Sequence, residues 1–267
     1  MLPLSDVDRL SRANLSGKLI PQHRALRRFE FPAWRWLSVL LIPIAFNVAL
    51  WWLRAPVAAL WAQIVDFWLP LLALPGHCLT LDVSWRAASL PVPAIALSAA
   101  PPTPYGWWFG LALSVLIWPL TKVLPQRLTP LTYVLRWCSL VQFTAQIYFW
   151  FWPTSFPHAI ADITHVEFGA GFALMFIAPW VHALTYNIFG FGWPRKIALT
   201  ALSLLYIGLA TPLLMTVHAW LIHHLSLLVA PLLYLIFGLL LLIAGLVGLY
   251  SWAMSWRMPA PADETLS

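Results

Sequence analysis

The chain has 267 residues, of which 61% are hydrophobic and 9% are charged, and its formal net charge is +6. Soluble domains carry roughly 25% charged residues, so this composition excludes an ordinary soluble domain and predicts an all-α integral membrane protein. Seven of the fifteen Lys and Arg residues precede Trp36, and most of the others lie in short loops. This distribution is typical of membrane topology signals and does not indicate nucleic-acid binding.

Residues 1–35 are predicted to form a basic arm on the cytoplasmic side. They contain no short apolar core followed by a small-residue cleavage site, so we do not predict a removable secretory signal. The arm either contacts anionic lipid head groups or acts only as a determinant of topology, and we favour the second interpretation.

Residues 36–253 are predicted to form a six-transmembrane-helix bundle, because apolar segments of about 20 residues recur between turn signals. The predicted spans cover residues 36–52, 106–123, 131–152, 164–189, 197–217 and 232–252. With these spans, most loop Lys and Arg residues fall in the cytoplasm, and most of the 18 Trp residues fall near a membrane interface. The expected location is the cell membrane, multi-pass, with both termini cytoplasmic and residues 254–267 as a cytoplasmic tail.

The segment 56–75 is apolar enough to cross the membrane but contains Gln63 and Asp66 near its middle. If it crossed, five loop Lys and Arg residues would move to the outer side, against the usual charge distribution. We therefore predict an interfacial or re-entrant helix on the outer face. Residues 76–105 follow as a Pro-rich outer loop with short strand-like pieces.

Ionisable side chains collect in one stretch, residues 153–167, between long apolar segments. His158, Asp162 and His165 fall at positions i, i+4 and i+7, so a helix would project all three from one face. Two imidazoles and one carboxylate are a usable ligand set for a divalent metal such as zinc. We nominate these three residues as candidate metal ligands; the alternative is that they are interfacial polar residues bonded to water and head groups.

Glu167 is predicted to lie one turn inside the fourth span, where an ionisable group is costly and usually faces a cavity or a partner. Its expected partners are His165, Arg86 or a histidine of residues 218–224. We nominate Glu167, His165 and Asp162 as candidate catalytic residues, with Glu167 as a general base or proton carrier. A structural ion pair is the alternative.

A polar stripe runs along the third predicted span, where Ser139, Gln142 and Gln146 fall at i, i+3 and i+7. Unsatisfied amides in hydrocarbon cost several kcal/mol, so this stripe should face other helices. The third span is therefore predicted to be central in the bundle.

The sequence contains no phosphate-binding glycine loop, nucleophile elbow or CxxC pair. Its preferred function is that of a polytopic inner-membrane protein acting as a subunit or assembly factor of an envelope complex, through helix and outer-loop contacts. The expected partners are the lipid bilayer and other membrane proteins. The alternatives are a membrane-embedded enzyme that uses the extracytoplasmic histidine cluster and its carboxylates on a lipid-linked or exported substrate, and a small transporter.

Overall fold

The structure is a computed structural model that describes residues 33–85, 88–188 and 191–255. The predicted basic arm up to residue 32, the tail from residue 256 and Arg86 lie outside the described residues. The described residues from Ser38 onward form one compact unit.

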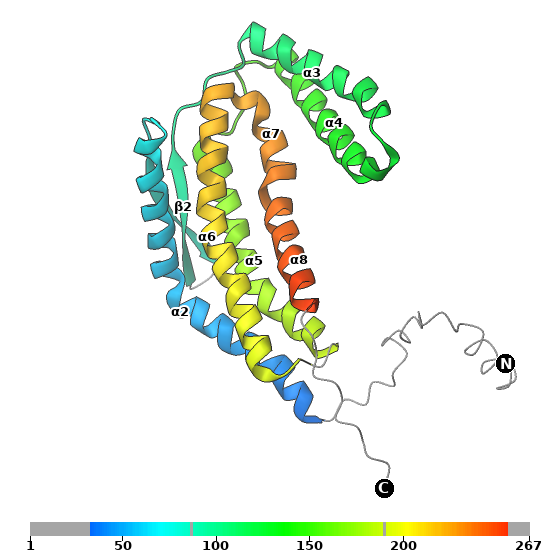
Figure 1. The fold of residues 1–267 in the computed structure, drawn as a ribbon. Helices are drawn as coiled ribbons and strands as arrows, with labels where there is room; N and C mark the ends of the chain where they lie inside the picture. The colour runs from blue at the N-terminus through cyan, green and yellow to red at the C-terminus, as the bar shows by residue number, and fades with distance from the viewer. Residues whose placement is uncertain (1–32, 86–87, 189–190, 256–267) are drawn as a thin grey trace, which may run out of the picture. The chain divides into compact units, whose positions relative to one another are not determined.

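The described chain is mostly helical and includes one β-hairpin (Figure 1). In chain order the elements are α2 (Ala33–Leu71), β1 (His77–Trp85), β2 (Ala88–Ala96), α3 (Pro104–Lys122), η2 (Gln126–Leu128), α4 (Thr129–Phe151), α5 (Ile160–Ile188), α6 (Trp193–Leu225), η3 (Leu227–Val229), α7 (Ala230–Leu232), η4 (Leu233–Gly238) and α8 (Leu239–Met254). Of these, η2 and η3 are 3₁₀ helices and η4 is a π-helix.

Within the described residues, four helical segments are long and apolar enough to cross a membrane, judged by length and composition. They are Val39–Leu71, Ile160–Thr185, Trp193–Leu225 and Leu227–Met254. These segments indicate a membrane-associated helical protein. The six predicted spans are not confirmed, because α3 and α4, which cover the second and third of them, are not among these segments.

The first predicted span and the interfacial helix predicted at residues 56–75 belong to one continuous helix, α2, of 39 residues. Arg54 lies between them, but its Nη1 donates to the Trp51 carbonyl at 2.6 Å and its Nε donates to the Ser89 carbonyl at 3.2 Å. Backbone carbonyls thus satisfy the guanidinium, and the helix continues through Arg54. At about 1.5 Å per residue, α2 is about 58 Å long, which exceeds the roughly 30 Å hydrocarbon core. The prediction of a separate interfacial helix is therefore corrected.

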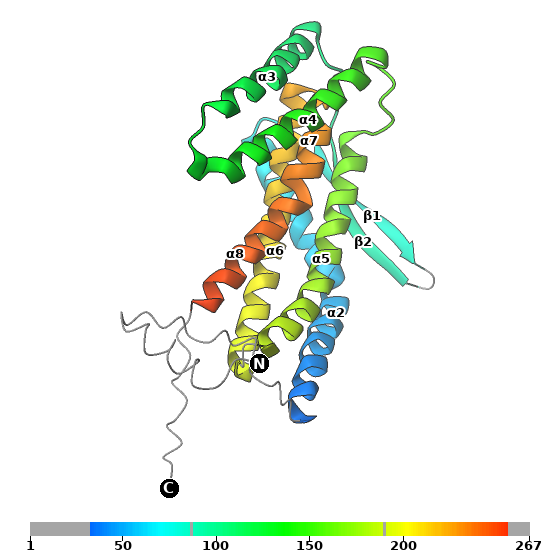
Figure 2. The same cartoon turned by 90° about the vertical axis from the view of Figure 1, so that its right-hand side faces the viewer.

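The predicted outer loop of residues 76–105 contains an antiparallel β-hairpin, with His77 paired opposite Ala96. β1 is largely exposed, whereas the middle of β2 is a run of small apolar residues that is buried against α5. The Ile95 N–H donates to Thr164 Oγ1 at 3.0 Å, which attaches β2 to the second turn of α5. Figure 2 shows the hairpin beside α5.

The largest apolar core joins α2, β2, α5 and α6 around Trp61, which is fully buried. The Trp61 ring centroid lies 4.4 Å from that of Phe172 and 5.5 Å from that of Phe168, both on α5. Its Nε1 donates a hydrogen bond of 2.7 Å to the Gly208 carbonyl in α6. In a regular helix that carbonyl would accept from residue 212, but Pro212 has no N–H. The indole therefore supplies the missing donor and joins α2 to α6.

α3 and α4 form a helical hairpin that polar side chains hold together. Ser139 Oγ donates to the Ser114 carbonyl at 2.6 Å and accepts from Trp118 Nε1 at 3.1 Å. Nearer the turn, Arg136 Nε donates to Thr121 Oγ1 at 3.0 Å. These contacts pair several of the polar groups between the two helices and leave large apolar side chains on the outside of the hairpin.

The prediction that Ser139, Gln142 and Gln146 face other elements is confirmed. Ser139 and Gln146 are buried, and Gln142 Nε2 donates to the Leu228 carbonyl at 3.1 Å. The prediction that this helix is central is wrong, because no α4 residue belongs to the largest core and α4 packs on α3 and the η3–α7 turn. α3 and η3 supply hydrogen-bond partners for Ser139 and Gln142 away from the centre, whereas Oε1 and Nε2 of Gln146 have none among the described residues.

Candidate functional site

A carboxylate and an imidazole meet at the contact between α5 and α6. Glu167 lies about two turns after the start of α5, and His218 lies about two turns before the end of α6. Because the chain reverses between these neighbouring helices, the two positions come to the same level. His218 Nδ1 lies 3.0 Å from Glu167 Oε2 and 3.2 Å from Oε1. The exposed fractions are 4% for Glu167 and 1% for His218.

The prediction that Glu167 pairs with a histidine of residues 218–224 is thus confirmed for His218. The two later histidines make different contacts. His223 Nδ1 donates to the Ser98 carbonyl at 2.8 Å, and the His223 ring centroid lies 5.3 Å from that of His224. Nδ1 of His165, another expected partner, is buried and has no hydrogen-bond partner.

The π-helix η4 encloses the carboxylate from a third side. A Cβ atom at Gly238, the last residue of η4, would lie 2.5 Å from Glu167 Oε1. Glycine is therefore the residue that leaves room for the carboxylate at this position. π-helical turns are rare and occur frequently at functional sites. Here the turn places backbone, rather than a side chain, against Glu167.

The geometry of the Glu167–His218 pair fixes where a proton can be exchanged. With Nδ1 facing the carboxylate, the neutral imidazole carries its proton on Nδ1 and a lone pair on Nε2. His218 Nε2 is buried and has no hydrogen-bond partner in the described part of the chain. A carboxylate that orients an imidazole in this way is the arrangement of a general base and its orienting group.

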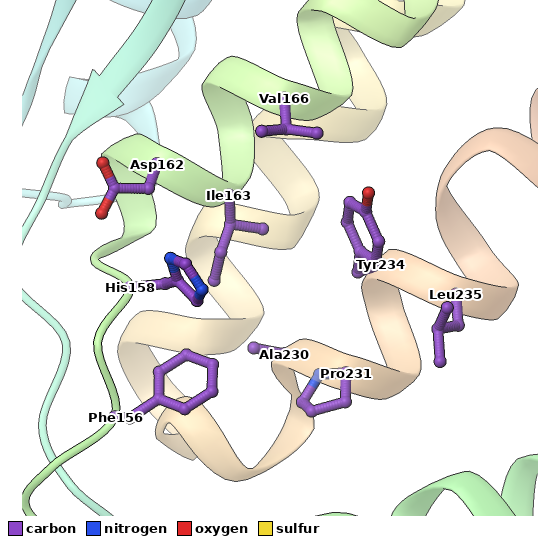
Figure 3. Close-up of a pocket in the computed structure, with 9 residues that line it drawn as sticks. All are labelled: Phe156, His158, Asp162, Ile163, Val166, Ala230, Pro231, Tyr234 and Leu235. Carbon is purple, nitrogen blue, oxygen red and sulfur yellow. The ribbon is translucent and has the colours of Figure 1, made fainter.

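Two adjacent cavities lie on the Glu167 side of the pair, and His218 lines neither of them. Glu167 lines a cavity of about 180 Å³ together with Tyr234 and Leu235. The same Tyr234 and Leu235 line a second cavity of about 380 Å³, whose other walls include His158 and Asp162 (Figure 3). The Tyr234 hydroxyl in Figure 3 points to the level of Val166, the neighbour of Glu167. The larger cavity thus contains the polar residues His158 and Asp162, the smaller one contains Glu167, and Tyr234 lines both.

The candidate metal ligands do not share the predicted helical face. α5 begins at Ile160, so His158 precedes the helix, and the exposed Asp162 accepts a hydrogen bond from the Ala159 N–H at 2.9 Å. That contact satisfies a backbone donor at the helix start. Across residues 33–85, 88–188 and 191–255, no group of three His, Cys, Asp or Glu side chains could hold a metal ion. The geometry therefore gives the predicted zinc site at His158, Asp162 and His165 no support.

Sequence reasoning missed two residues beside the pair, Gly238 and Tyr234. A glycine inside an apolar helical run is a recognisable signal of close backbone approach. Tyr234 is a polar side chain near the start of the last apolar segment. Neither residue could be assigned to Glu167 from the sequence, because Glu167 is some 70 residues away from both.

Comparisons of the chain with protein-family models, with curated proteins and with solved structures find no match.

Proposed function

We propose that this chain is a polytopic inner-membrane protein that acts as a subunit or assembly factor of an envelope complex, through the α3–α4 hairpin and the outer loops. The observation that carries this proposal is the apolar outer surface of the hairpin. α3 packs mainly on α4, and α4 packs mainly on α3 and the η3–α7 turn. Large exposed side chains of the hairpin include Tyr105, Trp108, Phe109, Leu113, Leu116, Tyr133, Trp137, Phe143, Trp150 and Phe151.

Three tryptophans near the open end of the hairpin form a fixed aromatic cluster. The Trp107 centroid lies 4.8 Å from that of Trp108 and 4.9 Å from that of Trp150. Trp107 Nε1 donates to the Gln146 carbonyl at 2.9 Å, while Trp108 and Trp150 are 58% and 59% exposed. Rigid aromatic side chains of this kind are enriched where proteins bind one another. The cluster therefore supports a preformed contact surface for another membrane protein.

Lipid covers apolar surfaces as well, so the test must distinguish lipid from protein. A photo-crosslinking amino acid is placed at Phe109 or Trp150 in cells, with Leu205 on α6, which is 57% exposed, as the matched control. We expect discrete protein adducts from the two hairpin positions and none from Leu205. Protein adducts that are absent from the hairpin, or equal at Leu205, would contradict the proposal.

We propose a topology to go with this function, in which both termini lie in the cytoplasm. Four candidate crossing segments are an even number, which returns the chain to its starting side. Arg195 and Lys196, at the start of α6, mark the cytoplasmic end by the usual charge rule. A reporter fused after residue 76 should then be extracytoplasmic, and a cytoplasmic reporter there would refute this topology.

The Glu167–His218 pair favours a second candidate, a membrane-embedded enzyme that acts on a lipid-linked or exported substrate by acid–base chemistry. Glu167→Gln and His218→Gln test it by complementation of the deleted gene. If the pair is catalytic, both variants accumulate and keep the hairpin cross-links but lose function. If they restore function as well as the parent, the enzyme proposal fails and the subunit proposal stands.

A further inference from the structure

α5 and the η4–α8 segment both pack on α6 (Figure 2). A groove lies between their side chains. It consists of three successive cavities of about 380, 180 and 420 Å³. From one end of the groove to the other, α5 contributes residues from Asp162 through Ala170 to Val181 to one wall. The η4–α8 segment contributes residues from Tyr234 to Tyr250 to the facing wall. We call these three cavities together the α5–α8 groove.

The residues of α5 that line the three cavities recur at helical spacing, so they lie along one face of this helix. Asp162, Val166, Ala170 and Leu174 follow at four-residue steps. From Asp162 to Thr185 this face is about 35 Å long at 1.5 Å per residue. One membrane leaflet has a hydrocarbon depth of about 15 Å, half of the bilayer core. The groove is therefore long enough for an alkyl chain of one leaflet.

The three cavities are too small to take in a whole transmembrane helix of a partner. A helix with side chains is about 10–12 Å wide, so a membrane-spanning segment of 30 Å occupies roughly 3,000 Å³. The largest of the three cavities has a volume of about 420 Å³. A single alkyl chain, which has no side groups, fits a narrow apolar channel of this kind.

The charged side chains that line the groove indicate which lipid head group would bind there. Asp162 is exposed at one end, next to His158, and Glu167 lines the middle cavity. None of the residues that line the three cavities is Lys or Arg. Because Glu167 is already paired with His218, Asp162 is the groove carboxylate that complements a cation, and the ammonium of an ethanolamine head group is such a cation.

We propose that the α5–α8 groove binds one alkyl chain of a membrane lipid whose ammonium head group lies at Asp162 and His158. This site is independent of the hairpin surface and of the proposed subunit function. It also differs from general lipid contact, because a lipid in the groove touches two facing helices and one defined carboxylate.

The test uses the purified full-length chain in vesicles that contain a phosphatidylethanolamine with a photoreactive diazirine in its alkyl chain. A phosphatidylglycerol with the same labelled chain is the second probe, and adducts are mapped on peptides. Val166→Trp and Val181→Trp fill two different cavities of the groove. Val217→Trp on α6 is the matched control, since the parent side chains are 50%, 48% and 47% exposed.

We expect phosphatidylethanolamine adducts to concentrate on α5 and α8, to fall several-fold in both groove variants and to persist in the Val217 control. Asp162→Asn should lower labelling by this probe about two- to fivefold, the size of an exposed ionic contact. It should leave labelling by phosphatidylglycerol unchanged. Equal labelling by both probes overturns the head-group assignment. Labelling spread evenly over all apolar helices and unaffected by both groove variants overturns the groove.

Discussion

The hydrogen bond from Trp61 to the Gly208 carbonyl predicts that the effect of Trp61→Phe depends on Pro212. The substitution keeps an aromatic ring but removes a donor to a carbonyl that the proline leaves without its helical partner. An unsatisfied buried carbonyl costs about 1–3 kcal/mol. The smaller ring adds about 1 kcal/mol through lost packing, because Trp61 is fully buried.

Pro212→Ala restores an N–H at residue 212, so the Gly208 carbonyl can return to its helical bond. Trp61→Phe should then cost only the packing part, about 1 kcal/mol, and the coupling free energy between the two sites should be about 1–2 kcal/mol. Unfolding of the four variants in mixed micelles with increasing sodium dodecyl sulfate measures this cycle. Trp52→Phe is the control, because Trp52 is 77% exposed. An equal cost of Trp61→Phe in both backgrounds would refute the reasoning.

Three further predictions concern single sites. Gly238→Ala should lower stability by about 1–3 kcal/mol, because the added Cβ would lie 2.5 Å from Oε1 of the buried Glu167. Gly248→Ala is the control and should leave the melting temperature unchanged, because a Cβ at Gly248 meets nothing within 4 Å. Gln142→Leu should insert normally yet lose about 0.6–2 kcal/mol in the same unfolding assay, and a variant as stable as the parent would contradict the role of this amide. Burial and the charge of Asp66 raise the pKa of Cys78 from 9.0 to about 11. Because only the thiolate reacts, alkylation of Cys78 at pH 8 should be about a hundredfold slower than for a thiol of pKa 9.0 and should rise with pH up to about 11. Asp66→Asn should accelerate it, and alkylation at the rate of an ordinary thiol would show that burial does not hold this pKa up.

The polar residues inside apolar segments could be assigned from the sequence, because hydrocarbon makes an unpartnered polar group costly. That argument predicted a histidine partner for Glu167 and protein partners for Ser139 and Gln142, and all three contacts are found. It uses only the position of a residue within its segment, so it does not require the fold to be known.

The continuity of α2 and the start of α5 could not be predicted in the same way. Arg54 marked a boundary in the sequence, but Ser89, 35 residues away, supplies one of its acceptors. Arg is a good helix former, so its charge alone does not end a helix, and whether the helix continues depends on contacts that the sequence does not show. The spacing from His158 to His165 assumed a helix throughout, whereas Pro157 precedes His158 and α5 begins at Ile160.

The buried Glu167–His218 pair is the feature that the subunit proposal leaves without a use. A buried carboxylate–imidazole pair is weak evidence for stability, because removing the carboxylate from water offsets much of its attraction to the imidazole, so we consider a role in specificity or in chemistry. Another contact already fixes the register of α5 against α6. A Cβ at Gly171 would lie 2.7 Å from Thr211 Cγ2, so α5 approaches α6 closely at this position. Trp61 also contacts both helices. Since register does not require the pair, the proposed acid–base role at His218 is the use that we assign to it, and complementation by the Glu167→Gln and His218→Gln variants tests that proposal.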